Sequence, residues 1–174
     1  MENKLRTRAK ELADQVVCNL VSHGWTVTSS ESCTGGLISA ELVGVAGASN
    51  VFSQGLITYS NQSKESLLGV RHETMELFGA VSPQTAREMA FGSRVCYQSD
   101  FGLSSTGIAG PDGGSESKPV GTVYLSCSYE GNTLVRHYAF SGDRNTVRDK
   151  ATAAALELLL DCIREKEKED QLCE

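Results

Sequence analysis

The sequence predicts a single three-layer α/β/α domain whose sheet is mixed. Segments of β-forming residues alternate with segments whose apolar residues recur at helical spacing, and this alternation indicates a sheet with helices on both faces. The last two predicted strands form a hairpin, which makes the sheet mixed rather than purely parallel. The chain has 174 residues with no internal repeat and no linker, so we expect one domain with one core.

The first half of the chain shows the alternation of helices and strands. Apolar residues at helical spacing, ending before Gly24, predict the first helix. The elements expected here are a helix over 4–22, a strand over 25–29, a polar turn over 30–36, a helix from Leu37, a Gly-rich loop over 43–50, and a strand over 51–60. The small polar turn between a strand and a helix is a candidate binding segment.

The second half of the chain continues the alternation of helices and strands. Ser82 and Pro83 form a strong helix start, with serine as the N-cap and proline at the first helical position. The elements expected here are short helices over 63–68 and 74–78, a helix over 83–96, a strand over 101–105, a Gly-rich loop over 106–119, and hairpin strands over 120–129 and 133–140.

A last helix follows residues 141–144. Its predicted core face consists of Val147, Ala151, Ala154, Leu158 and Cys162. The charged segment from Arg164 is expected to be solvated or frayed, so the domain is assigned to residues 1–163 and a charged tail to 164–174.

Composition excludes several classes of function. Sixteen Lys and Arg against 22 Asp and Glu give a net charge of −6, which argues against a broad nucleic-acid interface. No apolar run approaches a membrane span, and the polar N-terminus is not a signal sequence, so a cytoplasmic location is expected. The six cysteines form no C-x-x-C pair and no cluster with zinc spacing, so we expect neither metal nor cofactor.

Four polar, Gly-rich junctions are candidates for one composite site. Three follow predicted strands, at 30–36, 58–64 and 104–114, and a fourth opens the last helix at 141–148. Ligands of open α/β sheets gather at the carboxyl ends of the strands. The junctions therefore predict a ligand site at that edge of the sheet.

Ser32 lies between a strand and a helix, where two interpretations remain open. Unpaired N–H groups at a helix N-terminus could stabilise an oxyanion formed by a serine nucleophile, and Gly35 and Gly36 would let a substrate approach the backbone. Alternatively, Ser32 or Thr34 only caps the helix. The surrounding residues do not form the G-x-S-x-G elbow of α/β-hydrolases.

A serine nucleophile needs a base, and no histidine stands at a Gly-rich strand end. Lys64 and Tyr59 are the alternative, because a desolvated lysine loses pKa and can accept a proton. They could equally be a solvated lysine at a helix start and a tyrosine at the edge of the core.

Arg144 and Arg148 are four residues apart and share one face near the start of the last helix. Arginines at a helix N-terminus suit a phosphate group. The alternative is a solvated face on which they pair with Asp143 or Asp149. The loop over 106–114 is a weakly specific, backbone-lined ligand loop.

Taken in order, six blocks of sequence resemble the CinA C-terminal domain family, from about residue 8 to 162. They are Glu31-Ser32-Cys33-Thr34-Gly35-Gly36, Thr58-Tyr59-Ser60-Asn61 with Lys64, Gly79-Ala80-Val81-Ser82, Thr106 to Gly114, Lys118 to Val123, and Gly142-Asp143-Arg144. The resemblance implies a nicotinamide-nucleotide amidohydrolase, which converts nicotinamide mononucleotide to nicotinic acid mononucleotide and ammonia. It also implies a stand-alone form without the larger N-terminal domain, and a homodimer.

The resemblance also implies roles for individual residues. Ser32 is the nucleophile, and Tyr59 and Lys64 activate it. Substrate contacts are expected from the turn formed by Cys33, Thr34, Gly35 and Gly36, from Thr106 and Gly107, and from Arg144. Cys33 is a rival nucleophile. Ser30 and Ser141 depart from the family pattern, which commonly has Ala and Pro at these two positions.

Two other classes of function remain open. One is a catalytically inactive paralogue that binds a nucleotide or regulates through the same fold. The other is a hydrolase of a different small amide that does not recognise phosphate.

Overall fold

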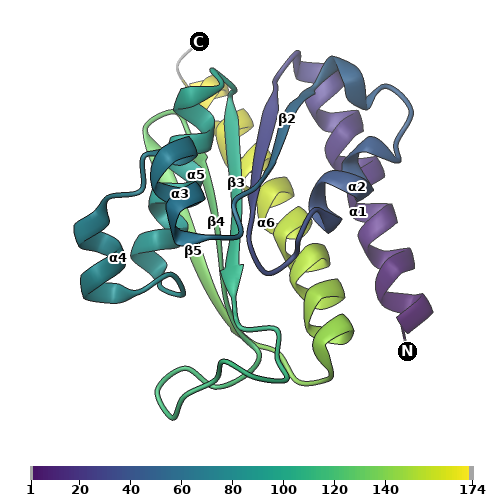
Figure 1. Ribbon diagram of the computed structural model, residues 1–174. Coiled ribbons are helices and arrows are strands. Elements are labelled where there is room, and N and C mark those ends of the chain that lie inside the picture. The colour runs from purple at the N-terminus through teal and green to yellow at the C-terminus, as the bar shows by residue number, and fades with distance from the viewer. Residues whose placement is uncertain (1, 173–174) are drawn as a thin grey trace.

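Five strands form one mixed sheet at the centre of the molecule (Figure 1). The computed structural model describes residues 2–172. The strands are β1 (Val27–Glu31), β2 (Phe52–Ile57), β3 (Phe101–Gly107), β4 (Thr122–Tyr129) and β5 (Asn132–Ala139), in the order β2-β1-β3-β4-β5. β1 runs parallel to β2 and β3, whereas β4 is antiparallel to β3 and β5. The mixed sheet is therefore confirmed.

Helices cover both faces of the sheet, as predicted (Figure 1). They are α1 (Glu2–His23), α2 (Leu37–Val43), α3 (Asn61–Leu68), α4 (His72–Phe78), α5 (Pro83–Cys96) and α6 (Arg144–Leu172), with a 3-10 turn over Ala48–Asn50. α6 packs on one face with α1 and α2 beside it, and α5 packs on the other with α3 and α4 beside it. The Ser82 side chain accepts a hydrogen bond from the Thr85 N–H, so the predicted start of α5 is confirmed.

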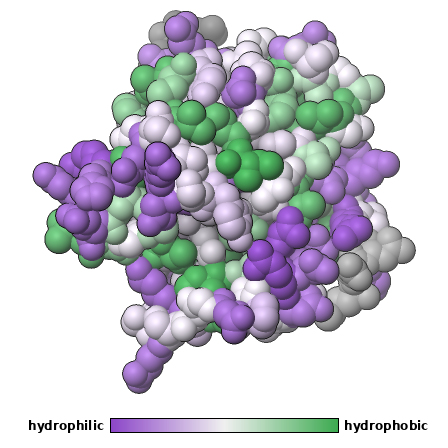
Figure 2. Space-filling view, in the orientation of Figure 1, coloured by the Kyte–Doolittle hydropathy of each residue, from purple (hydrophilic) through white to green (hydrophobic). Residues whose placement is uncertain are grey.

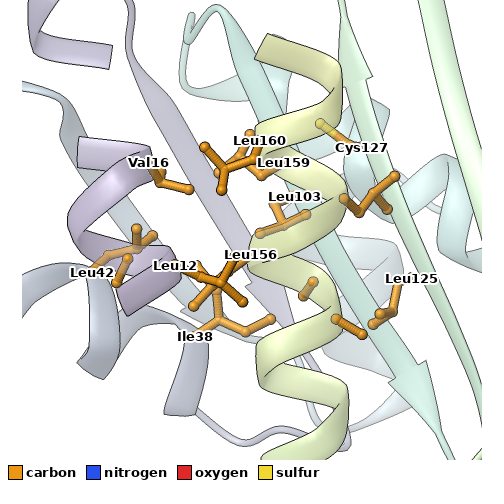
Figure 3. Packing of buried hydrophobic residues seen from close by; sticks show 14 of the residues in the cluster. Leu12, Val16, Ile38, Leu42, Leu103, Leu125, Cys127, Leu156, Leu159 and Leu160 are labelled. Carbon is orange, nitrogen blue, oxygen red and sulfur yellow. The ribbon is translucent and has the colours of Figure 1, made fainter. Parts of the chain in front are cut away.

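The main core lies between the sheet, α6 and α1 (Figure 3). All five residues of the predicted core face of α6 are buried, but its burial extends around most of the helix between Ala151 and Ile163. A helix that is buried on nearly every side needs apolar residues all round. Leu12 and Val16 of α1 and Leu103 of β3 belong to this core around α6.

The first strand lies two residues later than predicted, and this places Ser30 and Glu31 in the sheet instead of the following turn. Small polar side chains can continue a buried strand when they find hydrogen-bond partners. The Ser29 hydroxyl lies 2.9 Å from that of Ser39, and Ser30 donates to the Leu103 carbonyl at 3.3 Å. The polar turn therefore begins at Ser32.

The segment after Arg164 continues α6 as far as Leu172 and does not fray before that residue. Its long side chains fold back on the domain. Tyr129 donates to Glu165 at 3.0 Å, and the Lys166 ammonium lies 5.0 Å from the centre of the Trp25 ring. Within the described residues, no helix combines the length and apolarity that crossing a bilayer requires.

Candidate active site

A cleft of about 210 Å³ opens at the carboxyl ends of β1, β2 and β3, the edge of the sheet predicted to hold a ligand. It lies at the end of the sheet that carries the long loop seen at the bottom of Figure 1. The lining residues are Ser32, Cys33, Tyr59, Asn61, Lys64, Ala80, Val81, Thr106, Gly107, Ala109 and Arg144. Segments far apart in the sequence thus meet in one place.

Ser32 and Lys64 are in hydrogen-bond contact across this cleft. The Lys64 Nζ lies 3.2 Å from the Ser32 Oγ, although 32 residues separate them in the sequence. Ser32 follows β1 directly, and Lys64 lies in the first turns of α3, whose N-cap Ser60 accepts a hydrogen bond from the Ser63 N–H. The strand and the helix therefore hold the two groups from opposite sides.

The amine of Lys64 is buried without a carboxylate partner. Lys64 is 1% exposed, and its Nζ donates to the backbone carbonyls of Thr58 at 2.8 Å and Tyr59 at 3.3 Å. Burial disfavours the charged form and lowers the pKa of Lys64 from 10.5 to about 8, with a small opposing effect from the Cys33 thiol. A lysine in this state can take up a proton near neutral pH.

A buried carboxylate shapes the turn that carries Ser32. Glu31 is 0% exposed, and its two oxygens accept hydrogen bonds from the N–H groups of Gly36, Ile38 and Ser39 and from the hydroxyls of Thr34 and Ser39, at 2.6–3.1 Å. Gly36, the N-cap of α2, has φ 95°, which glycine adopts without strain. Glu31 thus supplies the acceptor that the N-terminus of α2 otherwise lacks.

Arg148 holds the same turn from its other side. Its Nε donates to the Cys33 carbonyl at 3.2 Å and its Nη2 to the Thr34 carbonyl at 2.8 Å. Neither the Cys33 N–H nor the Thr34 N–H donates to a backbone carbonyl within the described residues, and the Cys33 N–H lies against its own sulfur. The prediction that Arg148 joins Arg144 in an anion site is therefore wrong, because the guanidinium of Arg148 turns inward onto backbone carbonyls.

Cys33 is buried and does not present a thiolate to the cleft. Burial raises the pKa of its thiol to about 11, and a hydrogen bond with Ser105 opposes this shift only in part. The thiolate is the nucleophilic form of cysteine, and it is scarce at neutral pH when the pKa is this high. Burial and the raised pKa of the thiol therefore argue against Cys33 as a nucleophile.

Tyr59 and Arg144 form the outer wall of the cleft. Arg144 donates from Nη1 to the Gly110 carbonyl at 2.7 Å and from Nη2 to the Tyr59 hydroxyl at 3.3 Å. Both side chains are exposed. No hydrogen bond among the described residues joins the Tyr59 hydroxyl to Ser32 or Lys64, so its role as a proton relay stays a prediction.

The remaining wall is built from backbone and small residues. The Thr106 hydroxyl donates to the Ala80 carbonyl at 2.7 Å, which ties the end of β3 to the segment before α5. At Gly107 a Cβ atom would lie 2.7 Å from the Thr122 carbonyl oxygen, too close for any side chain. Glycine thus allows β3 and β4 to approach closely beside the cleft.

Most of the predicted site residues meet here, but three do not line the cleft. Thr34 is buried, and its hydroxyl contacts Glu31 and Ser105, while Gly35 and Gly36 shape the turn behind Ser32. Sequence reasoning missed four lining residues: Asn61, Ala80, Val81 and Ala109. All four fall within the sequence blocks that resemble the family, and this resemblance is the signal that could have identified them as lining residues. Among the described residues, no group of three or more His, Cys, Asp or Glu is placed to hold a metal ion.

Comparisons with known proteins agree with this arrangement. Residues 9–163 match the family described as CinA C-terminal domain. The nicotinamide-nucleotide amidohydrolase PncC of Escherichia coli K12 is 47% identical over 150 residues, which cover 86% of this chain and 91% of that protein. A CinA-like protein of Kosmotoga olearia is 48% identical over 151 residues, covering 86% of this chain, which spans only 37% of that longer relative.

Solved structures show the same fold. The crystal structure of a competence/damage inducible protein from Agrobacterium tumefaciens superposes with a TM-score of 0.85 at 41% identity, covering 88% of this chain and 94% of that one. The family match over nearly the whole chain and the shared fold lead to the same conclusion. This chain belongs to the CinA C-terminal domain family.

Proposed function

We propose that this protein is a nicotinamide-nucleotide amidohydrolase that converts nicotinamide mononucleotide to nicotinic acid mononucleotide and ammonia, with Ser32 as its nucleophile. The observation that carries the proposal is the 3.2 Å contact between the Ser32 hydroxyl and the buried amine of Lys64. The similarity to the Escherichia coli amidohydrolase supports the reaction and the substrate class.

Hydrogen bonding around Lys64 favours its role as the base. A neutral amine has two N–H groups and one lone pair, and the two backbone carbonyls that contact Nζ can only accept hydrogen bonds. When both N–H groups face those carbonyls, the lone pair is left for the hydroxyl of Ser32. This arrangement lets Lys64 remove the Ser32 proton.

The reaction then proceeds in two steps. The Ser32 Oγ bonds to the carboxamide carbon while Lys64 takes its proton, and the N–H groups of Cys33 and Thr34, which donate to no backbone carbonyl, are assigned to the oxyanion. Lys64 returns the proton to the amide nitrogen, the C–N bond breaks, and ammonia leaves. Water, deprotonated by Lys64, attacks the acyl carbon and releases the nicotinic acid product as Ser32 regains its proton.

Arg144 and Tyr59 are assigned to the phosphate and ribose of the substrate. Arg144 is exposed at the mouth of the cleft and has no carboxylate partner among the described residues. A planar guanidinium suits a phosphate group. Unchanged KM in Arg144→Ala would instead favour a small amide substrate without phosphate.

Self-association as a homodimer is also proposed, on the resemblance to the family. Hydrophobic residues are exposed beside the edge strand β2, with Val43 64% and Ile57 58% exposed. Figure 2 shows hydrophobic surface near the middle of the face where β2 and β3 run. Sedimentation of the purified chain at the mass of a monomer would refute the dimer.

The decisive experiment measures ammonia release from a panel of pyridine nucleotides and their nucleosides. We expect turnover of nicotinamide mononucleotide, and a loss of about 10⁴-fold or more in Ser32→Ala. Ser49→Ala, which changes an exposed serine outside the cleft, is the matched control. A fully active Ser32→Ala would refute the nucleophile, and a folded wild-type chain that binds nucleotides without turnover would identify the inactive paralogue.

A further inference from the structure

A second cleft, of about 390 Å³, lies at the opposite end of the sheet from the proposed active site. It is formed between the outer face of α5 and the turn that joins β4 to β5. The side chains that matter here are Arg87, Phe91, Arg94, Ser128, Asn132 and Thr133. None of the residues that line this cleft belongs to the proposed catalytic machinery, so it needs an explanation of its own.

The cleft gathers two arginines that form no ion pair with a carboxylate of the described residues. The arginines that form ion pairs within the described chain are Arg6, Arg8, Arg71, Arg136 and Arg164. Arg144 lines the first cleft, Arg148 binds the carbonyls of Cys33 and Thr34, and Arg87 and Arg94 both line the second cleft. In a protein with a net charge of −6, two unpaired arginines in one cleft indicate a place for an anion.

Neutral partners hold both guanidinium groups in place. Arg94 donates from Nε to the Ser128 hydroxyl at 3.3 Å, and its guanidinium carbon lies 5.8 Å from the centre of the Phe91 ring. Arg87 donates from Nη1 to the Thr133 carbonyl at 2.9 Å. These contacts restrict the side chains and leave their charge intact, so little ordering entropy is lost when an anion binds.

Acidic side chains in this part of the fold have another partner or lie outside the lining of the cleft. Glu165 accepts the hydroxyl of Tyr129 at 3.0 Å, and the Asn132 amide donates to the same hydroxyl. Glu130, in the turn itself, is exposed and does not line the cleft. The anion site is therefore not filled from within the chain.

An aromatic ring stands between the two arginines. Arg87, Phe91 and Arg94 are spaced by four and three residues and share one face of α5. The arginines are two turns apart, roughly 10 Å along the axis, so that their long side chains can converge on one phosphoryl group. Phe91 is 52% exposed, which leaves ring surface available for stacking.

We propose that this cleft is a second, non-catalytic site that binds a nucleotide, with its phosphoryl group on Arg87 and Arg94 and its base stacked on Phe91. The hydroxyls of Ser128 and Thr133 and the amide of Asn132 offer hydrogen bonds to the sugar. This site goes beyond the proposed reaction and does not depend on it. Binding there can be measured in a chain that has no hydrolytic activity.

The test uses adenosine monophosphate, inorganic phosphate and adenosine as probes. Calorimetry gives the affinities, and amide shifts in NMR spectra locate the ligand. We expect adenosine monophosphate to shift the amides of residues 131–133, and to do so equally in Arg144→Gln, where the first cleft has lost its cation. Phosphate should compete, and adenosine should bind far more weakly.

Substitutions then assign the contacts. Arg87→Gln and Arg94→Lys should each weaken adenosine monophosphate binding about tenfold or more, whereas Arg164→Gln, which removes the same charge elsewhere, should not. Phe91→Leu should weaken binding of the nucleotide but not of phosphate. Without added adenosine monophosphate, ammonia release from nicotinamide mononucleotide by Arg87→Gln should stay within about twofold of wild type.

Three outcomes would overturn the proposal. The first is amide shifts confined to the first cleft, and the second is unchanged affinity in Arg87→Gln. The third is a change in the sedimentation of the unliganded chain on Arg87→Gln, because the cleft would then be an interface between copies. An equal response of phosphate and nucleotide to Phe91→Leu would overturn the assignment of a nucleotide.

Discussion

The two sides of the turn after β1 are built on opposite principles. On the side away from the cleft, Glu31 and Arg148 have hydrogen-bond partners that fix the backbone. On the side of Ser32, Lys64 is buried with no carboxylate partner among the described residues, and the N–H groups of Cys33 and Thr34 donate to no backbone carbonyl there. The comparison indicates how the fold holds such groups in place. Glu31 and Arg148 use their hydrogen bonds to fix the backbone, so that Lys64 can stay buried without a counter-ion.

The sharpest way to break this contrast is to remove the buried amine. Lys64→Met keeps the length of the side chain but has no base, so we expect kcat to fall about 10³-fold or more. Because the buried ammonium is lost as well, the variant should still fold. Lys150→Met, which changes a lysine outside the cleft, is the control, and steady-state ammonia release is the measurement. Retained activity in Lys64→Met would show that another group is the base.

The pH profile tests the same group in the intact protein. Only the neutral amine can act as the base, and the pKa of Lys64 is lowered to about 8. We therefore expect kcat/KM to rise about tenfold per pH unit below pH 8 and to level off above it. A profile that is flat between pH 6 and 8 would contradict this assignment.

The burial of Lys64 should also make the free energy of unfolding depend on pH. The sign of this dependence is opposite to that of a salt-bridged lysine, because the pKa of Lys64 is lowered by folding and not raised. The folded-state pKa of Lys64 lies below its unfolded value of 10.5, so the folded chain binds fewer protons between pH 8 and 10.5. Burial of Lys64 is therefore least favourable below pH 8 and improves as the pH rises. Any stability that Lys64→Met gains at pH 7 should shrink toward pH 10.5, as measured by urea unfolding.

On the side of the turn held by Glu31 and Arg148, the largest expected effect is on the stability of the fold. Glu31→Gln replaces one acceptor oxygen by an NH₂ group that faces N–H donors, which should lower the free energy of unfolding by about 2 kcal/mol or more. For a chain of this length the melting temperature should drop by roughly 4–8 °C. Glu116→Gln, in the exposed loop, should leave it unchanged. An unaltered melting temperature in Glu31→Gln would mean that the turn does not depend on this carboxylate.

The smallest expected effects are kinetic, and they distinguish the two arginines of α6. Arg148→Gln should lower kcat about tenfold with little change in KM, since it loosens the backbone that carries the oxyanion donors. Arg144→Gln should mainly raise KM, because Arg144 is assigned to the phosphate. Equal effects of both variants on KM would instead mean that Arg148 also contacts the substrate.

The order and type of the elements could be predicted because they depend on local patterns. The helical spacing that begins with Val147 and the serine and proline at the start of α5 are properties of neighbouring residues. The end of β1 was predicted too early, because its small polar residues resemble a turn until their partners on other segments are known. Local polarity is thus a poor guide to strand ends inside a sheet.

The candidate site could be predicted in its membership but not in its chemistry. Lys64 lies among polar residues in the sequence, and only the packing of α3 against the rest of the fold buries its amine. Arg144 and Arg148 look equivalent in sequence, yet one reaches the cleft and the other a pair of carbonyls. Such differences arise from contacts between segments more than 80 residues apart.

The burial of Lys64 also means that its amine has a lowered pKa only in the folded chain. In an unfolded chain this amine has an ordinary pKa and stays a hydrated, unreactive ammonium. On the proposed mechanism, its pKa falls far enough to supply a neutral amine to Ser32 only after α3 packs against α5 and brings Lys64 to the end of β1. Loss of catalysis in mild denaturant would then report the undocking of that helix before global melting.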